Sequence, residues 1–263
     1  MIRFNRPDLV GQTAVLVHAR HPYDRSGKRT MYFCHTPAIW RQFPQLVPGL
    51  LLIDGIAAQA NTATRLEPFY ARARERLAPG PESELPEIAA WRRAYAQMGM
   101  KPTQYRSAAE ALLRRFRREG ALPQLHPLVD LCNAVSLAFA LPVAVFDLDG
   151  VDGYLEVRHS SGTEQYLAFS GEVEAPEPGE VIFADAANQV HARRWTFRQS
   201  RRSTASQDTR RALIVSEGLH ATADADVRAL LDALAGEISA VWAAPVGRAI
   251  LTADAPRWEL PVG

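Results

Sequence analysis

The sequence of 263 residues has two cysteines, no long apolar run and none of the common short catalytic motifs. Cys34 and Cys132 lie far apart without metal-type spacing, which predicts reduced thiols in a cytosolic (cytoplasmic) protein. A membrane-spanning helix needs about 20 apolar residues, and the most apolar segment, 131–146, is interrupted at Asn133 and Pro142. The sequence therefore predicts no membrane partner.

Familiar signatures of cofactor and metal chemistry are also missing. There is no Walker loop, no glycine fingerprint for dinucleotides, no His-Glu-x-x-His and no nucleophile elbow. The seven histidines are scattered, with no pair at metal-ligand spacing, and no Ser/His/Asp set can be assembled from the sequence. We therefore predict no cofactor and no metal, and the sequence does not indicate an oligomeric state.

The first 30 residues differ from the rest. They show little periodicity, and their charged residues exclude a secretory signal. Met31 opens a far more regular segment, so we expect residues 1–30 to be a leader from a start site upstream of the natural one. The intact mass of the protein made from its native promoter tests this expectation. The remaining chain is divided into residues 31–100, 101–245 and a tail, 246–263.

Periodicity predicts helices and strands that are mixed without regular βα alternation, which is typical of an α+β fold. Ser107 and Glu110 form a capping-box pattern at the start of one helix, and Pro48-Gly49 is interpreted as a turn. Beside a short helix at Pro37, helices are expected at 61–77, 85–98, 106–118 and 226–243. Strands are expected at 50–53, 154–159, 164–169, 181–184, 190–195 and 212–216.

A polar stripe lies inside the apolar stretch from Leu122 to Asp149. Asp130, Asn133 and Ser136 recur at i, i+3 and i+6, which places them near one side of a helix. Buried polar groups need partners. The stripe either ties the helix to neighbouring backbone or faces a ligand pocket.

Polar residues also close several apolar runs. Glu217 follows a buried strand, and Asp185 closes another in the same way. Such carboxylates either line a pocket or are simply solvated. The segment WTFRQ, from Trp195 to Gln199, alternates aromatic and polar side chains. It can stack on an unpaired base and hold phosphate, or it is an exposed strand with its aromatic rings packed inward.

The net charge is only +1, but many of the arginines are concentrated in two segments of the chain. One cluster spans 114–118 and a second spans 193–211, whereas the acidic residues lie mostly elsewhere. Segregated arginine suits a phosphate backbone; the alternative is two solvated faces. The arginines predicted to bind tRNA are Arg114, Arg115, Arg118, Arg198, Arg201 and Arg202.

Between Lys101 and about Leu219 the chain resembles the B3/B4 domain, the editing module of the β subunit of bacterial phenylalanyl-tRNA synthetase. The resemblance is carried, in order, by HPLVDLCNAVSLAFALPVAVFDLD, GEVEAPEPGEVIFAD and SRRSTASQDTRRALIVSEGL. The segments KPTQYRSAAEALLRRF and WTFRQS are more similar to stand-alone members, one group of which is similar to canavanyl-tRNA(Arg) deacylases. The resemblance to the B3/B4 domain implies a B3/B4-like α+β fold at 101–245, with the preceding region of helices and strands packed on this domain.

The resemblance also implies an activity: hydrolysis of the ester that joins a wrong amino acid to tRNA. The family's pocket asparagine falls on Asn133 and its pocket glutamate is similar to Glu217, whereas Ala144 stands where the synthetase has a histidine. We predict Asn133 and Glu217 as catalytic. Substrate-binding roles are predicted for Asp130, Ser136, Asp185, Trp195 and Gln199.

The leading hypothesis is a deacylase acting in trans, with canavanyl-tRNA(Arg) as the first candidate substrate. An aminoacyl ester is already activated, so a positioned water and an oxyanion donor suffice without a nucleophilic side chain. Canavanine is cationic and needs carboxylate partners, for which Asp130, Asp185 and Glu217 are candidates. The alternatives are a deacylase for another wrong amino acid and a non-catalytic RNA-binding module.

Overall fold

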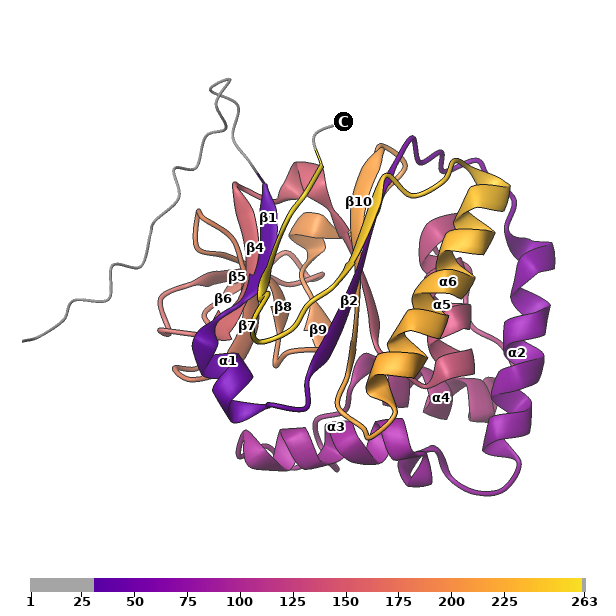
Figure 1. The fold of residues 1–263 in the computed structure, drawn as a ribbon, viewed down its shortest axis with the longest axis horizontal. Coiled ribbons are helices and arrows are strands. Elements are labelled where there is room, and N and C mark those ends of the chain that lie inside the picture. The colour runs from indigo at the N-terminus through magenta and orange to yellow at the C-terminus, as the bar shows by residue number, and fades with distance from the viewer. Residues whose placement is uncertain (1–30, 262–263) are drawn as a thin grey trace, which may run out of the picture.

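Two β-sheets lie side by side, and a layer of helices covers the outer face of one of them (Figure 1). The computed structural model describes residues 31–261, so the predicted leader lies outside the described residues. The larger sheet has eight strands in the order β12-β1-β4-β7-β8-β5-β6, with β9 paired to β8. The smaller sheet is antiparallel, in the order β11-β2-β10-β3. The α+β prediction is confirmed.

The larger sheet is formed by β1 (Tyr32–His35), β4 (Tyr154–His159), β5 (Gln165–Leu167), β6 (Val173–Glu174), β7 (Val181–Ala184), β8 (Gln189–Arg193), β9 (Arg198–Gln199) and β12 (Arg257–Glu259). The smaller sheet is formed by β2 (Val47–Asp54), β3 (Val143–Asp147), β10 (Arg211–Gly218) and β11 (Gly247–Ile250). The α-helices are α1 (Pro37–Gln42), α2 (Ala63–Leu77), α3 (Pro86–Gln97), α4 (Ala108–Glu119), α5 (Pro127–Phe139) and α6 (Ala223–Val241). Three short 3₁₀ helices are η1 (Glu82–Glu84), η2 (Leu148–Gly150) and η3 (Arg201–Ser203).

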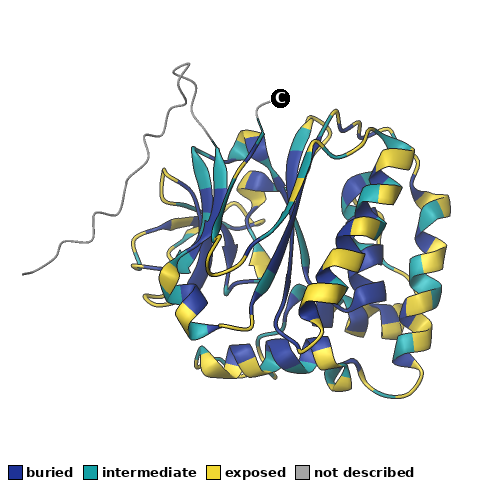
Figure 2. Ribbon diagram, in the orientation of Figure 1, coloured by how far each residue is buried: buried dark blue, intermediate teal, exposed yellow. Residues whose placement is uncertain are grey.

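The smaller sheet has an apolar core on each face, and its two central strands, β2 and β10, are mostly buried (Figure 2). Along β10, Leu213 and Val215 face the larger sheet, whereas Ala212 and Ile214 face α5 and α6. This alternation follows from the two-residue period of a strand. Because both faces are covered, β10 is apolar from Ala212 to Val215, and the Glu217 side chain near its end lies between the two sheets.

All three predicted regions contribute to the sheets. From residues 31–100, β1 pairs with β4 and β2 pairs with β10. From the tail, β11 pairs with β2 and β12 pairs with β1. The leading region is therefore packed on the B3/B4-like part through backbone hydrogen bonds, as predicted. No helix among the described residues is both long and apolar enough to cross a bilayer.

Several local predictions are confirmed. The strands expected at Tyr154–His159 and Val181–Ala184 have those bounds. The cap of α4 is also as expected, because Ser107 Oγ accepts a hydrogen bond from the Glu110 N–H at 3.2 Å. The Glu110 carboxylate pairs with Arg92 and Arg106 instead of returning to the cap, so only half of the capping box forms.

The turn predicted at Pro48-Gly49 is wrong, because both residues lie inside β2. A Cβ on Gly49 would lie 2.4 Å from Val227 Cγ1 and 2.9 Å from Leu231 Cδ1. The glycine therefore allows α6 to lie directly on the strand.

The strand predicted at 190–195 ends two residues early, at Arg193. Arg194 and Trp195 have positive φ values of 47° and 58° and form a turn that joins β8 to β9. Such left-handed conformations are costly for residues other than glycine, so the surrounding structure must hold this turn in place.

Candidate functional site

A cavity of about 440 Å³, including its mouth, lies between the two sheets. Its apolar wall includes Phe183, Phe197 and Val215, and Ala144 and Ala192 keep it open because their side chains are short. The polar residues that line it are Thr196, Arg198, Gln199 and Glu217. Among the residues that the structure describes, Glu217 supplies the only carboxylate of this lining.

Glu217 stands near the end of β10 and is 2% exposed. Its Oε1 accepts a hydrogen bond from His35 Nε2 at 2.6 Å, and its Oε2 accepts one from the indole Nε1–H of Trp195 at 2.9 Å. The indole Nε1–H of Trp91 donates to the backbone carbonyl of Glu217 at 3.3 Å. The carboxylate is thus held in one orientation by two rings at the wall of the cavity.

His35 is a site residue that the sequence analysis missed. Its ring is buried at the end of β1, and the chain separates it from Glu217 by 182 positions. Its Nδ1 has no hydrogen-bond partner among the described residues. The sequence offers no local signal for this contact, because the contact arises from the parallel pairing of β1 with β4 and the stacking of the two sheets.

Trp195 enters the site from the turn between β8 and β9. Its side chain is fully buried, with ring centroids 4.8 Å from Phe43 and 5.0 Å from Trp91, both edge-on. The hydroxyl of Tyr95 donates to the Arg194 carbonyl at 3.0 Å and holds the turn. Of the two interpretations of WTFRQ, the structure supports inward packing for Trp195, in a turn followed by β9, whereas Phe197 is partly buried and lines the cavity.

Asn133 lines a second cavity, which adjoins the first. Val143 and Gln199 belong to the lining of both. Gln199 Nε2 donates to the Val145 carbonyl at 2.5 Å, so its amide is fixed between the two spaces. At the rim of the second cavity, Leu125 and Phe169 are 68% and 62% exposed. The structure therefore brings Asn133, Gln199, Trp195 and Glu217 into one region.

Asp130, Ser136 and Asp185 lie outside the lining of both cavities. Ser136 Oγ donates to the Leu141 carbonyl at 2.6 Å, and Asp130 Oδ1 accepts from the Leu125 N–H at 2.9 Å. Both residues thereby fix the loops at the ends of α5. The predicted stripe thus separates into two backbone ties and one cavity residue.

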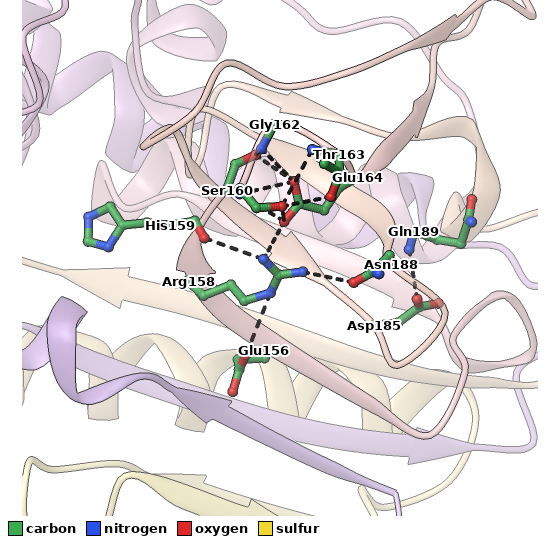
Figure 3. Close-up of polar contacts among 11 residues, drawn as sticks. Glu156, Arg158, His159, Ser160, Gly162, Thr163, Glu164, Asp185, Asn188 and Gln189 are labelled. Atoms are coloured by element: carbon green, nitrogen blue, oxygen red, sulfur yellow. Dashed lines mark hydrogen bonds and ion pairs between the residues drawn. The ribbon is translucent and has the colours of Figure 1, made fainter.

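Asp185 holds a loop of the larger sheet. Its carboxylate accepts hydrogen bonds from the backbone N–H of Asp152 and of Gln189, and from His191 Nε2 at 3.1 Å. Burial opposes ionisation, but the hydrogen bonds from His191 and the backbone lower the pKa of this carboxyl. Figure 3 shows it beside a second buried carboxylate network centred on Glu164.

The sequence matches a known family over more than half of its length. Residues 90–230 match the model of the B3/4 domain. The chain belongs to the B3/4 domain family. This range contains Asn133, Trp195, Gln199 and Glu217 but not His35. The site is therefore assembled from the B3/4 domain and from β1, which precedes it.

Curated relatives of this B3/4 protein are phenylalanine–tRNA ligase beta subunits. Identity is 34% over 74 residues with that of Legionella pneumophila (strain Lens), which is 28% of this chain and 9% of the relative. It is 27% over 145 residues with that of Cereibacter sphaeroides, or 53% and 18%. The chain thus spans less than a fifth of the length of these relatives.

A solved structure is also similar to this B3/4 protein. It is an N-terminal fragment of the phenylalanyl-tRNA synthetase beta-subunit from Pyrococcus horikoshii, with a TM-score of 0.41 and 10% identity. The alignment covers 81% of this chain and 49% of that one.

The two arginine clusters of the B3/4 protein differ in their pairing. On α4, Arg114 lies 3.5 Å from Glu82, and Arg115 and Arg118 lie 2.7 and 2.6 Å from Glu119. In the second cluster, Arg193 is buried and paired with Glu174 and Glu180. Arg198, Arg201 and Arg202, in contrast, are exposed and form no ion pair with a carboxylate among residues 31–261. Arg198 also lines the first cavity. These three arginines of the second cluster therefore offer unpaired positive charge next to the site.

The Glu164 network gives a prediction about stability and pH. Its carboxylate accepts from Ser160 Oγ at 2.6 Å, from the backbone N–H of Ser161 and Gly162, and from Arg158. Burial alone would raise the pKa of Glu164, but these donors hold the pKa far below its usual range. The carboxylate therefore contributes stability that is fully present above the unfolded pKa of about 4.3 and is lost as pH falls below it.

We expect Glu164→Gln to lower the free energy of unfolding at pH 7, with the difference from wild type shrinking as pH falls below about 4. Urea unfolding at a series of pH values measures this. Glu172→Gln is the control, because Glu172 is exposed. A Glu164→Gln difference that stays constant from pH 7 to pH 3 would contradict the assignment.

Proposed function

We propose that this protein is an aminoacyl-tRNA deacylase that acts in trans and hydrolyses the ester of a mischarged tRNA. Family membership and the relation to phenylalanine–tRNA ligase beta subunits support an RNA-linked editing role. The observation that carries the proposal is the Glu217 carboxylate, oriented by His35 and Trp195 at the wall of a cavity. The neighbouring amides of Gln199 and Asn133 support the same role.

Hydrolysis of an aminoacyl ester requires few catalytic groups from the protein. Water attacks the ester carbonyl, the bond to the terminal ribose oxygen breaks, and that oxygen takes up a proton as the amino acid leaves. An amide N–H such as that of Asn133 can stabilise the developing oxyanion. The second hydroxyl of the terminal ribose can relay the proton, so no nucleophilic side chain is required.

For the substrate, we propose a cationic amino acid, with canavanyl-tRNA(Arg) as the first candidate. A guanidinium-like group needs a carboxylate partner, and Glu217 is the only acidic residue among the described residues that line the cavity. Ala144 leaves room where a histidine ring would narrow the cavity. Because Asp130 and Asp185 lie outside the lining of both cavities, Glu217 is the favoured partner.

The decisive assay incubates the protein with tRNAs charged with canavanine, arginine, tyrosine and threonine and follows release of each amino acid. We expect rapid release of canavanine and little release of arginine. Selective release of a different amino acid would overturn the canavanine assignment while retaining the deacylase. Retained tRNA binding without hydrolysis of any ester would favour a non-catalytic RNA-binding module.

The interaction with tRNA phosphates gives a separate prediction. Replacing Arg201 and Arg202 with glutamine is expected to weaken tRNA binding and to reduce the slope of log K against log salt by about 1 for each phosphate that is no longer neutralised. Filter binding from 50 to 300 mM salt measures both quantities. Arg228→Gln is the control, because Arg228 is exposed on α6 and paired with Asp224. An unchanged salt slope would mean that these arginines do not bind phosphate.

A further inference from the structure

A second cluster of ionisable side chains lies just beyond the end of β10, on three different elements. Glu87 lies in the first turn of α3, His220 follows β10, and Asp226 lies in the first turn of α6. Each brings one potential ligand atom to within 4.8 Å of the other two. The cluster is not part of either cavity lining.

Two members of the cluster are buried and incompletely bonded. Glu87 is 7% exposed and His220 is 6% exposed. Glu87 Oε2 and His220 Nδ1 have no hydrogen-bond partner among the described residues. Burying an oxygen or nitrogen without a hydrogen-bond partner destabilises the fold, so two such atoms in one cluster indicate a ligand that supplies the missing interaction.

The contacts that are present leave these atoms free. Arg76 donates to Glu87 Oε1 at 2.6 Å and to the Ala138 carbonyl at 3.2 Å, which leaves Oε2 unused. Asp226 Oδ2 accepts from Thr222 Oγ1 at 2.5 Å and from His220 Nε2 at 2.9 Å. Arg76 balances one of the two carboxylates, and the second carboxylate is a negative charge that a cation would offset.

We propose that Glu87, His220 and Asp226 form a binding site for a first-row divalent cation such as Zn²⁺. One imidazole and two carboxylates are ligands that Zn²⁺ accepts, at about 2.0–2.2 Å from the metal. Two ligand atoms on one tetrahedral Zn²⁺ lie about 3.3–3.6 Å apart, so the 2.9 Å hydrogen bond between His220 Nε2 and Asp226 Oδ2 has to lengthen slightly if both atoms bind the ion. The alternative nitrogen, Nδ1, has a free lone pair while Asp226 orients the ring from the other side.

The site has an entrance and a structural consequence. The Asp226 side chain is 34% exposed, so solvent can deliver the ion and supply the remaining ligands as water. A bound ion would connect α3 and α6 to His220, three residues after Glu217. Because the ion would bind the folded state and not the unfolded chain, it would also stabilise the fold.

The spacing of the ligands explains why no sequence motif marks this site. His220 and Asp226 are six positions apart across a strand end and a helix start, and Glu87 is more than 130 positions earlier. Metal motifs are recognised when ligands share one helix or one short loop, and these three do not. Only the packing of α3 and α6 brings them together.

The test is titration of chelator-treated full-length protein with Zn²⁺ against a competing chromophoric chelator. We expect wild type to bind one Zn²⁺ per chain and to show a higher Tm when Zn²⁺ is present. Glu87→Gln and Asp226→Asn are each expected to bind Zn²⁺ at least tenfold more weakly and to show no rise in Tm. Asp224→Asn, an exposed neighbour on α6, is expected to match wild type. Co²⁺ in place of Zn²⁺ is expected to give visible absorption bands that Asp226→Asn weakens.

Three results would overturn the proposal. They are no Zn²⁺ binding by wild type above that of denatured protein, unchanged binding in Asp226→Asn, and an equal loss in Asp224→Asn. If Glu87→Gln does not fold, Asp226→Asn decides the matter, because its side chain is partly exposed and its replacement is nearly isosteric. Unchanged cobalt absorption in that variant would place the metal elsewhere.

Discussion

Replacing Glu217 with glutamine is expected to lower kcat/KM for the mischarged tRNA by about 100-fold or more. Glutamine has the shape of glutamate but lacks its charge, so a cationic substrate group would enter the cavity without a counter-charge. The hydrogen bonds with His35 and Trp195 can persist in part, and the fold is therefore retained. Single-turnover release of amino acid, together with circular dichroism of the variant, measures both effects.

The matched control is Glu177→Gln, because Glu177 is an exposed glutamate of the B3/4 domain. It is expected to hydrolyse the substrate at the wild-type rate. If Glu217→Gln does the same while its Tm falls, the Glu217 carboxylate is structural, and the substrate side chain must be recognised by other residues of the cavity. Arginine-like substrates that lose more rate than uncharged ones would confirm the charge effect.

Replacing Trp195 with alanine is expected to destabilise the protein by about 3–5 kcal/mol. The ring is fully buried, packs edge-on against Phe43 and Trp91, and donates to Glu217. Its removal leaves a hole between the sheets and a buried carboxylate oxygen without its donor. Urea unfolding followed by circular dichroism measures the loss.

Trp242→Ala is the comparison for this large substitution. Trp242 is only partly buried at the end of α6, where its indole N–H donates to the Ala57 carbonyl. We expect a loss below half of that for Trp195→Ala. Equal losses for the two variants would mean that the turn at Arg194 and Trp195 is held by contacts other than the Trp195 ring.

Elements governed by local chemistry were predictable from the sequence. The Ser107 cap sets the start of α4 through a hydrogen bond between residues three positions apart, and β4 shows the residue types of a strand. Errors arose where distant contacts override local preference. Gly49 is a turn former by propensity, but the approach of Val227 and Leu231 makes it a strand residue. Trp195 has high strand propensity, yet it adopts a left-handed backbone inside a turn.

The residues of the candidate site also fall into those that the sequence reveals and those that only the tertiary structure reveals. Glu217 was identifiable because a carboxylate interrupts a buried strand, and the structure places it in a cavity. Asp185 shows the same pattern but satisfies a loop backbone instead, since sequence does not reveal which strand ends face one another. His35 and the Glu87–His220–Asp226 cluster depend entirely on tertiary packing. Both lie where elements far apart in the chain meet.

The pairing of β1 between β4 and β12 has a consequence for biosynthesis. His35 is made before its neighbouring strand in the sheet, β4, which is about 120 residues further on, and Glu217 follows later still. Contacts between such distant segments form slowly, because long loops must close first. A nascent chain therefore contains residues of the site before the fold has brought them together. The site can therefore assemble only after β10, which carries Glu217, has left the ribosome.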